Sequence, residues 1–166
     1  MFETRPATEN DYEFLYQLHK AALGPYVAST WGWDEALQRR MFRERFRPEK
    51  NAIIMVDGEP AGCFRLQRHE GYDSLDYVAL LPAFQRRGIG TALIRKVKAS
   101  AAARGVPVRL SVLKANPARE LYERLGFEVT GWDAVRWYME CKTDSFVRAC
   151  SDAGRSPAPR PRRRAR

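Results

Sequence analysis

Cysteine and histidine are scarce in this chain of 166 residues. The three cysteines, Cys63, Cys141 and Cys150, lie far apart, and the two histidines are His19 and His69. A disulfide framework needs paired cysteines, and a structural zinc site needs four cysteine or histidine ligands, usually at short spacings. The sequence therefore excludes a disulfide-stapled fold and predicts that no metal is bound.

Long hydrophobic runs are also missing. No apolar stretch approaches the roughly 20 residues that a membrane-spanning helix needs, and the first residues do not read as a signal peptide. Hydrophobic residues make up 45% of the chain and charged residues 30%, a composition that excludes wholesale disorder. We therefore expect a soluble, cytoplasmic protein without a membrane partner. Its length suits one domain with a core.

Negative charge is in deficit mainly at the C-terminal end. The net charge is +9, and residues 145–166 supply +6 of it from seven arginines and one acid, Asp152. This proline- and arginine-rich segment has no apolar pattern, so we expect a basic, disordered tail after a domain over residues 1–144. Such a tail either binds polyanions weakly or only solvates the terminus. Net charge is therefore weak evidence for a nucleic-acid partner.

Hydrophobic periodicity predicts an α+β domain with a mixed sheet and the order β-α-α-β-β-β-α-β-α-β-β. Strands are expected over residues 2–6, 52–56, 61–66, 74–81, 106–113, 127–130 and 135–141. Helices are expected after an N-cap at Thr8, from 33 or 34 toward 46, from about 90 to a stop at Gly105, and between Asn116 and Gly126. Residues 24–32 are expected to form an aromatic loop.

The segment over residues 80–91 places a glycine- and arginine-bearing loop between a strand and a helix. Gly88 and Gly90 permit positive φ and let backbone N–H groups converge. Together with the positive end of the helix, these amides suit a pyrophosphate. The loop lacks the Gly-Lys-Ser/Thr ending of a Walker loop and the third glycine of the dinucleotide fingerprint. Alone, it fits a phosphate site or a tight turn.

A second segment, residues 116–127, carries a small residue and a tyrosine on one helical face. Ala118 and Tyr122 are four residues apart, so a ligand could pass the alanine and reach the phenol. A tyrosine near a leaving group can donate a proton to it. The alternative is a core tyrosine whose hydroxyl lies at the surface.

The two segments in register closely resemble the GNAT superfamily of acetyl-CoA-dependent N-acetyltransferases. The pattern is Gln-x-Arg-Gly-x-Gly after a strand, then, about 25 residues later, Asn-Pro-Ala-x-x-Leu-Tyr-x-x-x-Gly-Phe before a strand. The resemblance covers roughly residues 2–142. It implies a three-layer domain, a mostly antiparallel twisted sheet with a splayed central strand, and flanking helices. It also implies direct transfer of acetyl from acetyl-CoA to a primary amine, without an acyl-enzyme.

The same resemblance implies a cofactor site. The backbone of Val78, Ala79 and Leu80 would bind the pantetheine arm, and the Leu80 amide would polarise the thioester carbonyl. Asn116 would hold the arm by its side chain beside Ala118, and Tyr122 would protonate the departing thiolate. The pyrophosphate loop would consist of Gln85, Arg86, Arg87, Gly88, Ile89, Gly90 and Thr91.

The general base departs from the family pattern. Many relatives place a glutamate on the splayed strand, where this chain has Ser74. Asp76 lies two residues on and therefore on the same strand face, so it is the expected base, directly or through water. The alternative is a solvated or salt-bridged aspartate. Glu70 and Asp73 are weaker candidates.

The acceptor pocket is expected from the two N-terminal helices and the segment between them. Its lining would be the aromatic and acidic cluster Tyr26, Trp31, Trp33, Asp34 and Glu35, which suits a cationic amine. Core packing of the tryptophans is the rival interpretation, and His19 and His69 are expected to be surface or packing residues.

The expected acceptor is a small-molecule amine, and the alternative is a protein N-terminus or lysine. A non-catalytic acyl-CoA-binding or nucleic-acid-associated module is the alternative from another class. Nucleic acid is expected to bind only weakly, through the tail. A homodimer is common among relatives, and in them the final hairpin, here with Trp132, Trp137 and Tyr138, often borders the acceptor site or a dimer interface.

Overall fold

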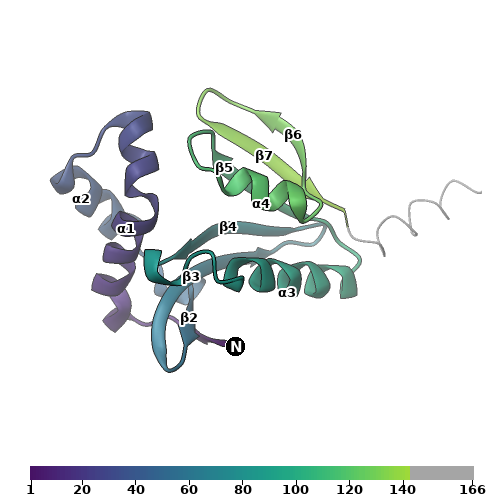
Figure 1. The fold of residues 1–166 in the computed structure, drawn as a ribbon, viewed down its shortest axis with the longest axis horizontal. Coiled ribbons are helices and arrows are strands. Elements are labelled where there is room, and N and C mark those ends of the chain that lie inside the picture. The colour runs from purple at the N-terminus through teal and green to yellow at the C-terminus, as the bar shows by residue number, and fades with distance from the viewer. Residues whose placement is uncertain (143–166) are drawn as a thin grey trace, which may run out of the picture.

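The computed structural model describes residues 1–142, so the predicted tail over residues 145–166 lies outside the described residues (Figure 1). Within residues 1–142, seven strands form one sheet in the order β1-β2-β3-β4-β5-β7-β6. β4 and β5 pair in parallel, and the other neighbouring strands are antiparallel, which confirms the predicted mixed sheet. The strands are β1 (Phe2–Pro6), β2 (Ala52–Val56), β3 (Glu59–Arg68), β4 (Asp73–Leu80), β5 (Val108–Leu113), β6 (Glu128–Trp132) and β7 (Arg136–Cys141).

Helices cover both faces of the sheet and make the predicted three layers (Figure 1). Successive strand residues point to opposite faces, so the two faces have separate cores. On one face, α1 and α2 pack over Ile53, Cys63 and Ala79; on the other, α3 and α4 pack over residues such as Leu75 and Leu110. The helices are α1 (Tyr12–Trp31), α2 (Glu35–Arg45), α3 (Ile89–Ala103) and α4 (Ala118–Arg124), with short 3-10 turns η1 (Glu9–Asp11), η2 (Pro48–Lys50) and η3 (Pro82–Phe84).

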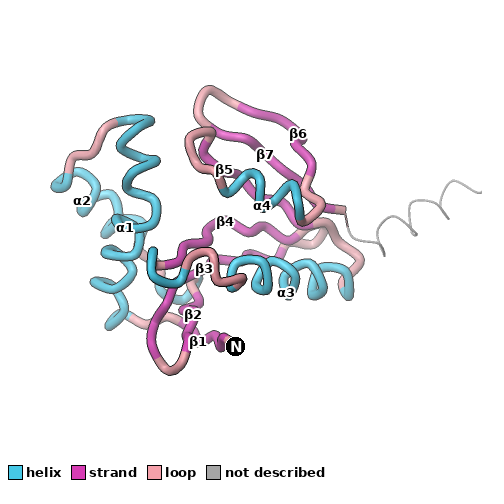
Figure 2. Tube along the Cα trace, in the orientation of Figure 1, coloured by secondary structure: helices cyan, strands magenta, loops and turns pink. Residues whose placement is uncertain are grey.

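The prediction of an aromatic loop over residues 24–32 is wrong, because α1 continues through that segment to Trp31 (Figure 2). Pro25 lies inside the helix, where proline normally breaks or kinks it. Tertiary contact outweighs this local preference: Val27 is buried, and a methyl group added at Gly24 would lie 3.5 Å from the Trp33 ring. The helix ends instead at Gly32, which has a φ of 79°.

The start of the first helix differs from the expected N-cap by one short turn. Thr8 precedes η1, and α1 begins at Tyr12. The Asp11 carboxylate accepts from the Thr8 N–H at 2.8 Å and pairs with the Arg5 guanidinium at 2.7 Å. The hydrogen bond from Arg5 is the main reason that the pKa of Asp11 is lowered to about 2. This ion pair ties β1 to the start of α1.

The central feature of the sheet is the separation of β4 from β5. The two strands pair only at Asp73–Val108, Ser74–Arg109 and Leu75–Leu110. β4 then continues to Leu80 and β5 to Leu113 without pairing with each other, while each stays paired with its other neighbour, β3 and β7. The resemblance predicted a splayed central strand, and β4 is that strand. We refer to the space between the unpaired parts of β4 and β5 as the strand opening.

Candidate active site

Alternate residues of β4 turn their backbone groups toward the strand opening. The Leu81 N–H donates to the Ala61 carbonyl of β3 at 2.9 Å, and Ala79 lies two residues before Leu81, opposite β3. Backbone groups of successive strand residues point to opposite neighbours. The amides of Val78 and Leu80 therefore face away from β3, toward the strand opening.

Ala79, the middle residue of the predicted trio, lies opposite Cys63 of β3, and its side chain is 4% exposed in the core under α1. By strand alternation its backbone groups face β3, whereas those of Val78 and Leu80 face the strand opening. Gln85 contacts the end of the same strand: its side-chain Nε2 donates to the Leu80 carbonyl at 2.8 Å.

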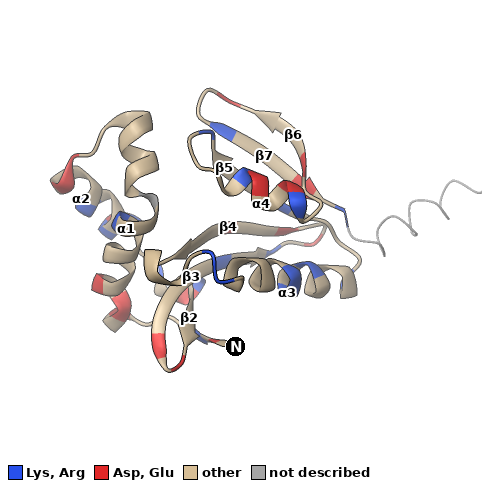
Figure 3. Ribbon diagram, in the orientation of Figure 1, with Lys and Arg blue, Asp and Glu red and all other residues tan. Residues whose placement is uncertain are grey.

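The loop before α3 presents backbone amides at the helix start. Gly88 is the N-cap of α3 with a φ of 79°, and among residues 1–142 no side chain caps this end. The first-turn amides of an α-helix have no intrahelical acceptor, so those of Ile89 and Thr91 point into the loop region. Arg86, with a φ of 58°, and Arg87 are exposed there, and Figure 3 shows their positive charge just before α3. This arrangement suits an anion.

Position 90 suits glycine for a different reason from the one expected. It lies in the first helical turn, and positive φ is found at Gly88 and not at Gly90. A methyl group at Gly90 would lie 3.8 Å from Leu121 Cδ2 and 4.0 Å from Leu80 Cδ1. The start of α3, the middle of α4 and the end of β4 therefore converge at this glycine. The two motifs that are distant in the sequence meet in one place.

Tyr122 lies on α4, next to Leu121 and on the α3 side of the sheet. Its ring packs edge to face against Phe127, with 5.8 Å between centroids. Burial raises the pKa of its phenol to about 12, so the hydroxyl keeps its proton at neutral pH. Asn116 precedes the helix, and its Oδ1 accepts from the Ala118 N–H at 2.9 Å. The side-chain amide of Asn116 still offers its NH₂ donors.

Asp76 stands at a β-bulge. Arg65 of β3 pairs with Tyr77 and Leu66 pairs with Leu75, so Asp76 is the extra residue on β4. Its carboxylate accepts hydrogen bonds from the Ser74 hydroxyl and the Gln67 side-chain amide. The prediction that Ser74 and Asp76 point the same way agrees with this contact.

The two weaker base candidates lie away from the strand opening. Asp73 is fully buried, pairs with Arg104 and belongs to the part of β4 that is still joined to β5. Glu70 is exposed in the turn before β4.

In the predicted acceptor cluster, the Glu35 carboxylate already has hydrogen-bond and ion-pair partners within the protein. Its carboxylate accepts from Tyr16 Oη at 2.9 Å and from Trp33 Nε1 at 3.0 Å, and pairs with Lys20 Nζ at 2.8 Å. The hydrogen bond from Lys20 is the largest cause that lowers the pKa of Glu35 to about 2. These contacts tie α1 to the start of α2. The carboxylate therefore serves the local fold.

The other members of the acceptor cluster are spread over the end of α1 and the turn to α2. Asp34 caps α2 by accepting from the Leu37 N–H at 2.9 Å. Trp31 is 55% exposed at the last residue of α1, and Tyr26 is half-buried one turn earlier. A cavity of about 200 Å³ lies beside Trp33 and is lined by Lys20, Gly24, Pro25, Ala28 and Trp33.

His19, expected to be a surface or packing residue, packs in an aromatic cluster that reaches β4, and sequence reasoning missed that cluster. Its ring lies 5.6 Å from Phe42, 6.3 Å from Trp33 and 6.4 Å from Tyr77 between centroids. Burial lowers the pKa of His19, so the ring is neutral at physiological pH. The buried Tyr77 hydroxyl has no hydrogen-bond partner within the described part of the chain, and burial raises its pKa. The signal in the sequence is the spacing of Tyr12, Tyr16 and His19 along one helical face.

A sequence model of the acetyltransferase (GNAT) family matches residues 12–127. The chain belongs to this family. Comparison with curated proteins gives no match.

Solved GNAT structures share the fold of this acetyltransferase. The PaiA N-acetyltransferase of Thermoplasma acidophilum, in complex with coenzyme A, aligns with a TM-score of 0.71 and 21% identity over 86% of this chain and 99% of that chain. The ribosomal-protein-S18-alanine N-acetyltransferase of Escherichia coli aligns with a TM-score of 0.62 and 22% identity, over 86% and 94% of the two chains. At these sequence identities, the likeness shows a shared fold and nothing further.

The matched region of the acetyltransferase contains β4, the loop before α3, and α4, which are the elements that converge at Gly90.

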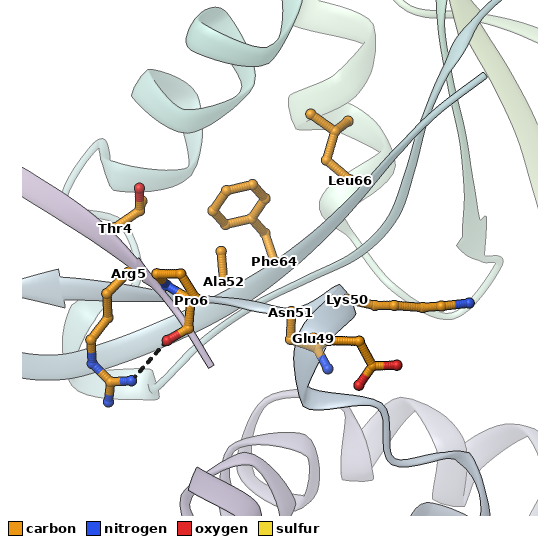
Figure 4. Close-up of a pocket in the computed structure, with 9 residues that line it drawn as sticks. All are labelled: Thr4, Arg5, Pro6, Glu49, Lys50, Asn51, Ala52, Phe64 and Leu66. Atoms are coloured by element: carbon orange, nitrogen blue, oxygen red, sulfur yellow. Dashed lines mark hydrogen bonds between the residues drawn. The ribbon is translucent and has the colours of Figure 1, made fainter. Parts of the chain in front are cut away.

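A further cavity, of about 340 Å³, lies away from the predicted site, where β1, β2 and β3 meet η2 (Figure 4). None of its lining residues belongs to the predicted site. In residues 1–142 no group of three or more metal-ligating side chains is close enough to hold a metal, and no helix is long and apolar enough to cross a membrane.

Proposed function

We propose that this acetyltransferase binds acetyl-CoA in the strand opening and transfers its acetyl group directly to the primary amine of a small molecule. The observation that carries the proposal is the convergence of Leu80, Gly90 and Leu121. It brings together the amides of the splayed strand, the uncapped start of α3 and the helix that bears Tyr122.

The pyrophosphate of the cofactor would lie at the start of α3. The amides of Ile89, Gly90 and Thr91 are directed into the loop, and the helix end carries partial positive charge. Arg86 and Arg87 add two exposed guanidinium groups, while Gly88 supplies the left-handed turn that side chains disfavour.

The pantetheine arm and thioester would follow β4 away from that loop. The amides of Val78 and Leu80 both face the opening, and the Asn116 side chain would bind the arm from the α4 side. At roughly 3.3 Å per strand residue, Leu80 lies about 13 Å and Val78 about 7 Å along β4 from Asp76. We therefore propose that the Leu80 amide, first expected at the thioester carbonyl, binds the arm, and that the Val78 amide polarises the carbonyl near Asp76.

The chemistry needs an acid and a base on opposite sides of the reacting carbon. Tyr122 keeps its proton at neutral pH, so it would donate to the departing sulfur. Asp76, exposed at the bulge, would take the proton of the attacking amine, directly or through water. The cofactor occupies the α3 side of the opening, so the amine would enter from the side of α1, near Tyr26, Trp31 and Trp33.

We propose a small acceptor on this side of the strand opening. The open hollow beside Trp33, about 200 Å³ in volume, would take one compact group of it. Glu35 and Asp34 would shape the wall indirectly, because their carboxylates already bind α1 and α2.

Acetyl transfer tests the proposal, with release of the CoA thiol as the signal. Two acceptors should be compared: 1,4-diaminobutane, and a peptide with a free α-amine and no lysine. We expect saturable turnover with the diamine and none with the peptide. Turnover with the peptide alone would favour a protein acceptor. Binding of acetyl-CoA without transfer to either would favour a non-catalytic acyl-CoA-binding module.

A further inference from the structure

We propose that Gln67 and Ser74 are positioning residues for Asp76. They hold its carboxylate, at the point where β4 separates from β5, in the orientation that accepts a proton. The inference rests on the proposed function, in which Asp76 is the base. It adds two residues to the reaction, one from β3 and one from β4.

The bulge and the strand opening begin at the same residue. The last β4–β5 pair is Leu75–Leu110, and Asp76 is the next residue. It is also the extra residue of the β3–β4 bulge, between the pairs Leu66–Leu75 and Arg65–Tyr77. A bulge bends its strand and re-aims a side chain. The side chain aimed here is a carboxylate at the point where β4 leaves β5.

Two neutral donors fix both oxygens of that carboxylate. The Ser74 hydroxyl donates to Oδ1 and the Gln67 Nε2 donates to Oδ2. Gln67 and Ser74 lie opposite each other in the β3–β4 register, so both reach Asp76 from one side. A carboxylate accepts about four hydrogen bonds, so two acceptor positions remain for the proton of an amine or water. Neutral donors orient the carboxylate without neutralising its charge.

The charged groups of the surrounding strands have other partners. On β3, Arg65 donates to Asn51 at 3.2 Å and Arg68 to Ser100 at 3.3 Å. On β5, Arg109 lies opposite Ser74 and pairs with Glu140 of β7 at 2.7 Å.

On β4 itself, Asp73 pairs with Arg104, and Tyr77, next in the chain, stacks against the His19 imidazole of α1. Tyr77 and His19 are both neutral at physiological pH, because burial raises the pKa of the phenol and lowers that of the imidazole. Gln67 and Ser74 are therefore the groups that set the orientation of Asp76 in the described structure.

The first test is the rate of acetyl transfer to 1,4-diaminobutane by the full chain at saturating acetyl-CoA. Gln67→Ala and Ser74→Ala should each lower kcat about tenfold, because the Asp76 carboxylate loses one of the two donors that orient it. Ser74→Thr keeps the hydroxyl and should restore the rate. Gln17→Ala is the matched control, because it removes an equivalent bond from Gln17 Nε2 to Glu13, 2.8 Å long, on α1.

The second readout is non-additivity in double variants. In an Asp76→Asn background, Gln67→Ala and Ser74→Ala should lower kcat no further, since the carboxylate that they orient is gone. The dissociation constant of acetyl-CoA should stay the same in all three.

Two results would overturn the inference. Unchanged rates in both alanine variants, or an equal further loss in the Asp76→Asn background, would show that these residues do not prepare a base. Absence of transfer by the wild type would instead contradict the proposed function itself, and the inference with it.

Discussion

Gly62 of β3 lies so close to β4 that a side chain at this position would clash with β4. Its substitution by alanine therefore tests how the position of β4 affects the proposed cofactor site. A Cβ at this position would lie 2.4 Å from the Ala79 carbonyl oxygen and 2.7 Å from Leu80 Cδ2. Real Cβ atoms essentially never approach closer than 3.0 Å, so β4 must move by at least 0.6 Å. Overpacking of this kind costs about 1–3 kcal/mol.

The moved strand is the one proposed to bind the cofactor, so Gly62→Ala should affect stability and binding together. We expect the free energy of unfolding in urea to fall by about 2 kcal/mol. In calorimetry, the dissociation constant of acetyl-CoA should rise about tenfold, the equivalent of roughly 1.4 kcal/mol. Gly71→Ala is the matched control, because a Cβ there meets nothing within 4 Å. Equal stability and equal affinity of the two variants would refute the reasoning.

Three further predictions concern the acid, the loop and acid stability. Tyr122→Phe should lower turnover about 100-fold or more with an unchanged dissociation constant for acetyl-CoA, since it removes only a proton donor, and full activity would reject that role. Gly88→Val and Gly105→Val, at φ values of 79° and 67°, should each lower the free energy of unfolding by about 1–3 kcal/mol. Only Gly88→Val should also weaken acetyl-CoA binding. Equal affinities of the two variants would show that the loop before α3 does not bind the cofactor. The lowered pKa of Asp11 means that its ion pair with Arg5 stabilises the fold above about pH 4 and that this contribution, roughly 2 kcal/mol, is lost as the pH falls toward 2. Asp11→Asn should flatten the decline in unfolding free energy over that window, and an unchanged decline would reject the ion pair as its cause.

Local sequence patterns were sufficient for much of the fold. Alternation and glycine or proline punctuation placed the strands to within about two residues, and the two motifs identified the loop before α3 and the helix that bears Tyr122. These features depend on neighbours in the chain, so they can be read from it. The splayed strand was expected only through the family resemblance.

Long-range packing decided what the sequence did not reveal. The Gly24-Pro25 pair reads as a loop, yet the contact of Trp33 with Gly24 and the burial of Val27 keep α1 helical to Trp31. Glu35 reads as a free carboxylate because its partners Tyr16 and Lys20 come from another helix.

The β-bulge is the third such feature. Strict alternation assumes an unbroken ladder, and the shift in register between β3 and β4 at Asp76 has no local sequence mark. The result is that Leu75 and Val78 contact the α3 core, while Tyr77 and Ala79 contact the α1 core.

Calorimetric titration of acetyl-CoA into the full chain is the most direct test of the proposed site, since every proposed role depends on a cofactor in the strand opening. We expect saturable binding of one acetyl-CoA per chain, weakened by Gly88→Val and not by Gly105→Val. Absence of binding at millimolar acetyl-CoA would contradict it.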